Sequence, residues 1–409
     1  MSRRLATLLL ILAAFIASAA GAIPRATANP SSDRLSFKDR VEVLEEVWKT
    51  VYEKYYDPSF KGTDWRAVRE RYRPLVDHAS SDEEFYTLLK RMVGELRDAH
   101  TRFHTPEERR ERERLQAVSA GLSIFEVEGQ PVVVSVAPDS DAARAGVEEG
   151  MIVLAIDGKP VVERLAEARS RVAGSSSDRA VNLRLYRMVL EGEPGTTVRI
   201  RFARADRTEI DVTLARRVVP DTAVVTSRRL QSSVGYIRLT LWKSPIRKQF
   251  KKALDGLKDA PGIVIDIRGN PGGEAEEVVK IASYFFSSHV PFGKFVKRSG
   301  RALFLRTDDH EQVYQGPVAI LINEGSGSGS ELFAGVMQES GRAVVVGRTS
   351  CGCVLGISSF KKVKGGGELA VSEYGYDSPQ GKTFETTGVI PDKTIQLKII
   401  DLEQHHDTT

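Results

Sequence analysis

Downstream of residue 36, apolar and polar positions first alternate at helical spacing. Between residues 37 and 56 the apolar side chains lie three or four positions apart, at Val41, Leu44, Val47, Trp48 and Val51, which places them on one face of a helix. The same spacing predicts helices over residues 65–78 and 85–96. Ser81 and Glu84 have the spacing of a capping box that opens the later helix. We therefore expect a helical N-terminal domain over residues 36–112.

From residue 120 the pattern changes to short apolar runs bounded by turn residues. These runs predict strands over residues 121–127, 132–136, 152–156, 198–202 and 210–214. One short helical turn, residues 142–145, interrupts them. The sequence thus predicts a β-rich domain over residues 113–218.

The last region alternates buried strands with amphipathic helices. Strands are expected at 235–239, 262–267, 318–322, 343–347 and near 368–373, with helices at 246–257, 276–286 and 332–338 between them. Such alternation is typical of an α/β fold whose ligands bind at the carboxyl ends of the strands. We place this core at residues 219–400 and a tail at 401–409.

The N-terminus has the pattern of an export signal. Arg3 and Arg4 precede an apolar run over residues 5–20, and Ala20-Gly21-Ala22 is an A-x-A cleavage site. We expect a signal peptide over residues 1–22 and a linker over 23–35, with Ala26-Thr27-Ala28 as a second possible cleavage site. The alternative is an uncleaved membrane anchor. Either way the protein is expected to be periplasmic or extracellular.

Charge and cysteine content narrow the possible functions. The net charge is +4 over 409 residues, and no basic block indicates nucleic-acid binding. The two cysteines, Cys351 and Cys353, lie only two positions apart, so a disulfide between them is expected to be unfavourable. Two thiols also do not complete a zinc site. No metal or other cofactor is expected.

A glycine- and serine-rich turn carries the clearest candidate chemistry. It follows the expected strand 318–322 and runs Gly325-Ser-Gly-Ser-Gly-Ser330 before the next helix. Such a turn can present a nucleophilic hydroxyl beside backbone N–H groups that stabilise an oxyanion. A flexible turn and a phosphate-binding loop are the alternatives, although the Lys-Ser/Thr ending of a P-loop is missing.

Residues 138–158, with Ala142, Gly146, Gly150 and Asp157-Gly158, resemble a PDZ domain. The resemblance implies that Gly121, Leu122, Ser123 and Ile124 form the loop that binds a peptide C-terminus, while the peptide adds a strand to the sheet edge. A β-rich spacer without a ligand is the alternative.

Three motifs occur in order in the last region: Asp266–Gly273 with Asn270-Pro-Gly-Gly, Ser326–Glu331, and Gly388–Asp392. With the PDZ-like domain ahead of them, they resemble the C-terminal processing (tail-specific) serine peptidases and their tricorn-core relatives. The resemblance implies a ClpP/crotonase-like α/β core. It makes Ser328 the nucleophile and assigns the oxyanion hole to the N–H groups of Gly329 and of Gly272 or Gly273.

The chain departs from the lysine-dependent members of that family. Counting 25 residues from Ser328 reaches Cys353, where those peptidases carry their lysine base. The tricorn-like branch uses histidine and glutamate instead, and His100 and Glu385 occupy the matching positions. This resemblance implies that His100 is the base, with a pKa of about 6–7, and that Glu385 orients it.

Several alternatives stay open from the sequence alone. His100 can be structural, and His104 or a Cys353 thiolate can be the base. The predicted function is that of an exported serine endopeptidase cleaving unfolded or C-terminally tagged proteins, with protein or peptide substrates as partners. A catalytically inactive, PDZ-containing peptide-binding protein is the alternative.

Overall fold

The computed structural model describes residues 35–405, except for 115, 173, 221 and 310–312. The expected signal peptide and both of its cleavage sites therefore lie outside the described residues. Within the described part of the chain, no helix is long and apolar enough to cross a membrane.

The N-terminal region contains the three expected helices, each with a side-chain cap. Ser36, Asp64 and Ser81 cap them by accepting hydrogen bonds from first-turn N–H groups. Their buried faces pack with residues of the core region, including Leu369 and Val371. The elements are α1 (Phe37–Lys54), the 3-10 turn η1 (Phe60–Gly62), α2 (Trp65–Asp77), α3 (Asp82–Gly94), β1 (Arg102–His104) and α4 (Pro106–Glu113).

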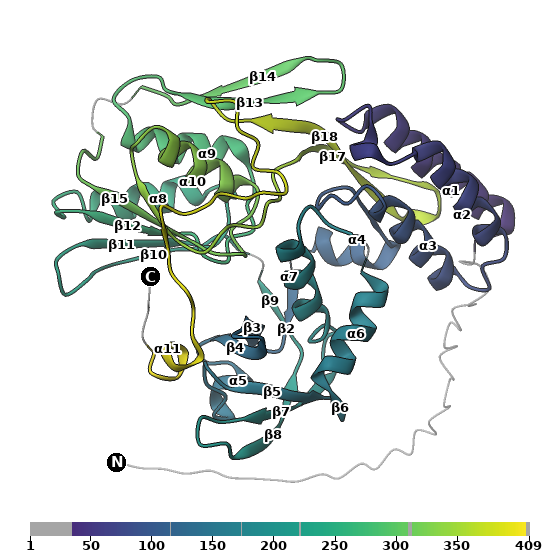
Figure 1. Ribbon diagram of the computed structural model, residues 1–409, viewed down its shortest axis with the longest axis horizontal. Coiled ribbons are helices and arrows are strands. Elements are labelled where there is room, and N and C mark those ends of the chain that lie inside the picture. Colours follow the sequence, from purple (N-terminus) through teal and green to yellow (C-terminus); the bar gives the residue numbers. More distant parts are fainter. Residues whose placement is uncertain (1–34, 115, 173, 221, 310–312, 406–409) are drawn as a thin grey trace, which may run out of the picture. The chain divides into compact units, whose positions relative to one another are not determined.

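The PDZ-like region is a sheet with two longer helices (Figure 1). Its strand order is β3-β4-β5-β7-β8, so β3 is an edge strand, and Phe125 of β3 contacts Tyr186 of α7. The strands are β3 (Leu122–Val127), β4 (Gln130–Val136), β5 (Ile152–Ile156), β6 (Lys159–Pro160), β7 (Thr197–Ala203) and β8 (Glu209–Ala215). The helices are α5 (Asp141–Arg144), α6 (Val161–Arg171) and α7 (Asp178–Met188). The pair β2 (Gln116–Ser119) and β9 (Arg217–Pro220) joins the two ends of the region.

The core is built on a mostly parallel sheet in the order β10-β11-β12-β15-β16-β19. All neighbours run parallel except β10 and β11. Strand and helix side chains bury a common apolar core. The strands are β10 (Val225–Arg229), β11 (Gly235–Leu239), β12 (Ile263–Asp266), β15 (Val318–Ile322), β16 (Val344–Gly347) and β19 (Lys393–Thr394). The helices are α8 (Ile246–Asp255), α9 (Ala275–Ala282), the 3-10 turn η2 (Ser283–Phe285) and α10 (Gly329–Glu339).

A second, antiparallel sheet was not expected from the sequence, apart from part of β18. It brings β1 of the N-terminal region alongside β18, with Phe103 opposite Leu369. Its order is β1-β18-β13-β14, and β17 also pairs with β18. The remaining bounds are β13 (Pro291–Lys297), β14 (Ala302–Arg306), β17 (Gly356–Lys362), the 3-10 turn η3 (Lys364–Gly366), β18 (Glu368–Asp377) and α11 (Ile399–Glu403).

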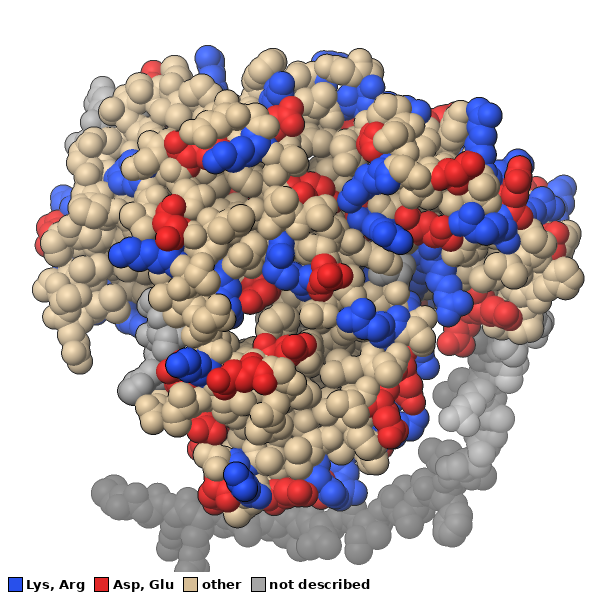
Figure 2. All heavy atoms as spheres, viewed as in Figure 1, with Lys and Arg blue, Asp and Glu red and all other residues tan. Residues whose placement is uncertain are grey.

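The face of the molecule in Figure 2 shows acidic and basic side chains interspersed over all regions. No single-sign field covers this face, in keeping with the small net charge of +4.

Candidate active site

The turn between β15 and α10 holds Ser328 in an unusual backbone conformation. Ser328 has φ 50° and ψ −114°, and it immediately precedes the first residue of α10. Positive φ in a residue with a Cβ costs free energy and is concentrated at functional sites. A strand-to-helix turn of this kind displays its side chain at the end of the sheet.

The two flanking serines are fully buried and bonded to the backbone. The Ser326 hydroxyl donates to the Ile267 carbonyl at 2.8 Å. The Ser330 hydroxyl donates to the Asn270 carbonyl at 2.9 Å and accepts from Trp242 Nε1 at 2.9 Å. Ser328, by contrast, is partly exposed. Of the three serines, only the middle one can therefore meet a substrate.

Two backbone N–H groups lie beside Ser328 without an acceptor in the described part of the chain, those of Gly273 and Gly329. The Gly272 N–H donates to Asn270 Oδ1 at 3.0 Å. The geometry thus favours Gly273 over Gly272 as the second oxyanion donor.

Glycine is required in this loop because the two turns approach closely. A Cβ on Gly272 would lie 2.6 Å from Ser328 Cβ, and one on Gly329 would lie 3.4 Å from the Gly273 nitrogen. Gly272 and Gly273 also have φ values of 111° and 138°, which side chains rarely permit.

Glu331 joins the Ser328 turn to the loop that follows β16. Its carboxylate accepts hydrogen bonds from the N–H groups of Ser328, Gly352 and Cys353 and from the Ser350 hydroxyl, at 2.6–2.9 Å. Burial raises the pKa of Glu331 to about 7, against these four donors, which lower it. The sequence motif included Glu331 but did not indicate this function.

Cys351 and Cys353 form a disulfide in the structure, contrary to the expectation from their spacing. Gly352 between them has φ 76°, and this turn leaves the two Cα atoms 5.3 Å apart, within the range of ordinary disulfides. A bonded sulfur cannot be a thiolate, so the alternative in which Cys353 is the base does not fit this structure.

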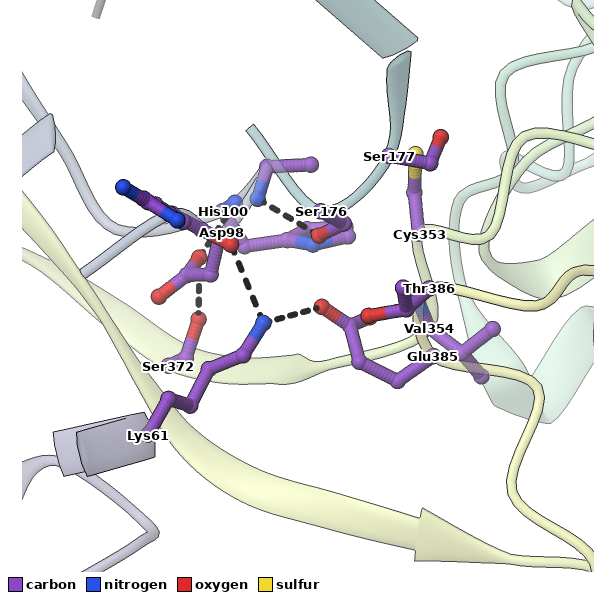
Figure 3. Close-up of polar contacts among 12 residues, drawn as sticks. Lys61, Asp98, His100, Ser176, Ser177, Cys353, Val354, Ser372, Glu385 and Thr386 are labelled. Atoms are coloured by element: carbon purple, nitrogen blue, oxygen red, sulfur yellow. Dashed lines mark hydrogen bonds and ion pairs between the residues drawn. The ribbon is translucent and has the colours of Figure 1, made fainter. Parts of the chain in front are cut away.

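His100 lies in a segment that Asp98 holds against β18 (Figure 3). Asp98 Oδ1 accepts from the N–H groups of His100 at 2.7 Å and Thr101 at 2.6 Å, and from the Ser372 hydroxyl at 2.9 Å. His100 Nδ1 is shielded from solvent and has no hydrogen-bond partner among the described residues. Loss of hydration lowers the pKa of His100 to about 4, below the expected 6–7.

Glu385 lies between the loop after β16 and the N-terminal region. Its Oε2 accepts from the Val354 N–H at 2.9 Å, and its Oε1 is 3.4 Å from Lys61 Nζ. Burial raises the pKa of Glu385, although the nearby Ser176 hydroxyl, the Val354 N–H and Lys61 lower it.

The structure brings the predicted catalytic residues into one neighbourhood around Cys353. The Cys353 carbonyl accepts from the Ser328 N–H at 2.9 Å, the next residue binds Glu385, and Ala99, next to His100, packs on the cysteine pair. Among the described residues, no hydrogen bond joins the His100 side chain to Ser328 or Glu385. His104 instead lies against Phe360 and near Glu108.

Three polar residues of this neighbourhood were not predicted: Lys61, Ser176 and Arg179. Lys61 lies on a 3-10 turn at φ 54°, and Arg179 donates to the carbonyls of Ser350 and Thr387. No local pattern marks them, because the partners of their side chains lie 36 or more residues away in sequence. A cleft of about 890 Å³ opens beside them, lined by Lys61, Arg97, Ser177, Asp178 and Thr386 among others.

The predicted peptide-binding loop lies at the start of edge strand β3. Gly121 has φ 85°, and Leu122 and Ile124 are buried in the PDZ-like core, whereas Ser123 is exposed. The apolar side chains thus support the fold, while the backbone of the strand edge lies beside α7.

Known protein families match parts of all three regions of the chain. The sequence profile of peptidase family S41 matches residues 233–395, that of the tricorn protease C1 domain residues 37–94, and that of the PDZ domain residues 132–187. The carboxyl-terminal-processing protease of Synechocystis sp. is 28% identical over 383 residues, covering 90% of this chain and 84% of the relative. The carboxy-terminal processing protease CtpB of Bacillus subtilis is 29% identical over 283 residues, covering 68% and 55%.

Solved structures share the fold. The photosystem II D1 C-terminal processing protease has a TM-score of 0.61 at 24% identity, covering 87% of this chain and 93% of that one. Mature CPAF complexed with lactacystin has a TM-score of 0.69 at 14% identity, covering 90% and 96%. The expected fold class, an α/β core with a helical N-terminal unit and a PDZ domain, is confirmed.

The fold and the Ser328 turn define a serine-type hydrolase that carries a PDZ domain. Residues 233–395 match peptidase family S41, and the relatives of the chain are carboxyl-terminal processing proteases. The alternative of a catalytically inactive peptide-binding protein is not favoured.

Proposed function

We propose that this peptidase is exported and cleaves unfolded or C-terminally tagged proteins with a Ser328–His100–Glu385 catalytic set. The observation that carries the proposal is the Ser328 turn, in which a partly exposed hydroxyl at positive φ lies beside the N–H groups of Gly273 and Gly329, which have no acceptor among the described residues. Donors placed in this way stabilise the anion of a tetrahedral intermediate.

In this mechanism Ser328 attacks the peptide carbonyl while His100 takes its proton. His100 then returns the proton to the leaving amine, and water hydrolyses the acyl-enzyme by the same route. Because the pKa of His100 is about 4, its imidazole is neutral and able to accept a proton at pH 7. Glu385 orients the imidazole and stabilises the imidazolium. Their hydrogen bonds form as the side chains close around substrate, since such contacts tighten in the substrate complex.

Labelling with a serine-reactive phosphonate tests the nucleophile. We expect stoichiometric labelling of the wild-type protein, none of Ser328→Ala and greatly slowed labelling of His100→Ala. A matched control is Ser340→Ala at the other end of α10, whose hydroxyl donates to the Val336 carbonyl and should leave labelling unchanged. Labelling that persists in Ser328→Ala would remove Ser328 from the role of nucleophile.

The second component of the proposal is peptide capture by the PDZ domain. β3 is an edge strand with α7 beside it, so an extended peptide can add a strand there and place its carboxylate at Gly121–Ile124. Binding to Ser328→Ala should weaken when the peptide's C-terminus is amidated, as measured by fluorescence anisotropy. Equal affinity for the free acid and the amide would contradict this binding mode.

Export rests on the N-terminal sequence pattern alone. If residues 1–22 are removed, the mature chain in a periplasmic or extracellular fraction begins at Ile23, which intact-mass measurement can establish. Recovery of a full-length chain in the membrane fraction would support the anchor alternative.

A further inference from the structure

Ser176 belongs to the PDZ-like region but lies against the proposed catalytic groups of the other two regions. It precedes α7 and is only 4% exposed. Its Oγ accepts a hydrogen bond from the Ala99 N–H at 2.9 Å, one residue before His100. The same hydroxyl lies close enough to Glu385 to lower the pKa of that carboxyl, which burial raises. Figure 3 shows Ser176 beside the Asp98–His100 segment, on the side toward Glu385.

The donor and acceptor roles of this hydroxyl are determined by its neighbours. A serine hydroxyl has one proton and two acceptor lone pairs. Since the Ala99 N–H must donate, it uses a lone pair of Oγ. The proton of Ser176 is then available for Glu385, which as a carboxylate can only accept. One side chain therefore bonds to the segment of the proposed base and lies beside the carboxylate that would orient it, although among the described residues His100 and Glu385 do not bond directly.

The residues that follow fasten Ser176 to the same site. The Ser177 hydroxyl donates to the Cys351 carbonyl, and Arg179 donates to the Ser350 carbonyl at 2.7 Å and to the Thr387 carbonyl at 2.8 Å. These bonds attach the start of α7 to the loop under Ser328 and to the segment after Glu385. Bonds to the loop under Ser328 and to the segment after Glu385 thus hold the chain around Ser176 in place.

We propose that Ser176 is a positioning residue supplied by the PDZ domain, which holds Glu385 and the His100 segment in the arrangement that catalysis requires. The inference rests on the proposed Ser328–His100–Glu385 mechanism and extends it. It implies that the peptidase core without its PDZ domain lacks part of the support of its own catalytic set.

Several other charged or titratable groups also face Glu385, and they matter for the test. Lys61 from η1 lowers the pKa of Glu385, and Asp98 raises it. Tyr55 and Tyr56, just after α1, are also near: burial and, to a lesser extent, the charge of Glu385 raise the pKa of both tyrosines. The Ser176 hydroxyl, like Lys61, lowers the pKa of Glu385 and so favours the carboxylate. Loss of the hydroxyl should therefore raise the pKa of Glu385 further.

The test compares Ser176→Ala with Ser175→Ala and Ser176→Thr in the full-length protein. The Ser175 hydroxyl is buried and has no hydrogen-bond partner among the described residues, so Ser175→Ala removes a neighbouring hydroxyl without removing a bond. Peptide cleavage gives kcat and KM, phosphonate labelling gives the pH dependence at Ser328, and thermal unfolding gives stability.

We expect Ser176→Ala to lower kcat by about 10–100-fold, with KM within about twofold, corresponding to loss of one hydrogen bond to a charged group. The acid limb of its labelling profile should move to higher pH. Ser175→Ala should match the wild type, and Ser176→Thr, which keeps the hydroxyl, should recover most of kcat and the wild-type acid limb.

The inference is overturned if Ser176→Ala behaves like Ser175→Ala. It is also overturned if Ser176→Ala loses rate only in proportion to lost folded protein, with an unmoved acid limb. Both results would leave Ser328 labelled and the proposed function intact. Persistent labelling of Ser328→Ala would instead refute the proposed function itself.

Discussion

The two sides of the proposed catalytic site are built in different ways. On the Ser328 side, Ser326, Ser330 and Glu331 each bond to backbone groups of the core region. On the His100 side, the polar groups come from three regions of the chain. There, His100 Nδ1 and Asp98 Oδ2 are shielded from solvent without a hydrogen-bond partner among the described residues.

This difference indicates that the proposed nucleophile is preorganised, whereas the proposed base is assembled by contacts between regions. The Ser328 turn is held by bonds within the core region, to Ile267, Asn270 and the loop after β16. A base that depends on Lys61, Ser176 and β18 responds to any change in how those segments pack. The site can therefore lose activity on one side while the other remains intact.

Replacing the base should have the largest effect. His100→Ala is expected to lower kcat by about 10³–10⁶-fold, and Glu385→Gln by somewhat less, because the hydroxyl loses its proton acceptor. His104→Ala is the matched control and should retain kcat, since His104 lies against Phe360. Full loss in His104→Ala with activity in His100→Ala would transfer the role of base to His104.

Replacing Glu331 should disrupt the hydrogen-bond network that holds the Ser328 turn. Glu331→Gln puts an amide donor among four donors, and a buried unmatched group costs about 1–3 kcal/mol. We expect a lower unfolding temperature and about a 10²-fold loss of kcat. Glu339→Gln, at the far end of α10, is the control for a buried glutamate on the same helix. An unchanged kcat in Glu331→Gln would show that this network does not position Ser328.

Removing the disulfide should have a smaller effect. Its loop keeps the bonds of Gly352 and Cys353 to Glu331 and of the Cys353 carbonyl to Ser328. The double variant Cys351→Ser/Cys353→Ser should retain kcat within about tenfold, or ~1.4 kcal/mol. Loss of all turnover, with normal folding by circular dichroism, would make the sulfur atoms part of the mechanism.

The smallest effect is expected from the Lys61 ion pair, and it concerns pH. The pKa of His100 is about 4, so its basic form persists well below pH 6. Glu385 has a raised pKa that Lys61 lowers, so Lys61→Met should raise it and move the acid limb of kcat/KM to higher pH. Lys54→Met, which breaks the ion pair with Glu373, should not. An acid limb that Lys61→Met leaves unmoved would contradict the assignment of that limb to Glu385.

The helices and strands of the fold also differ in how well the sequence predicted them. The strands β5, β11 and β15 and the helices α1 and α2 agree with expectation to within two residues, because their apolar spacing is local and strong. The helices α6 and α7 and the strands β13, β14 and β17 were not expected. Their segments carry many charges, and they are fixed by pairing or packing with distant residues, as β13 is by β18.

By itself, the sequence indicated the resemblance to C-terminal processing peptidases, the order of the three regions and the Ser328 turn. Glycine spacing and a strand-to-helix change require only neighbouring residues. Tertiary structure alone decided that the Gly272 N–H donates to Asn270 while the Gly273 N–H has no acceptor among the described residues, that the cysteines pair, and that Glu385 lies near Lys61 and Ser176. These outcomes depend on which donors and acceptors meet after burial. Their energies are set by loss of water and by partners far away in the chain, which no local pattern records.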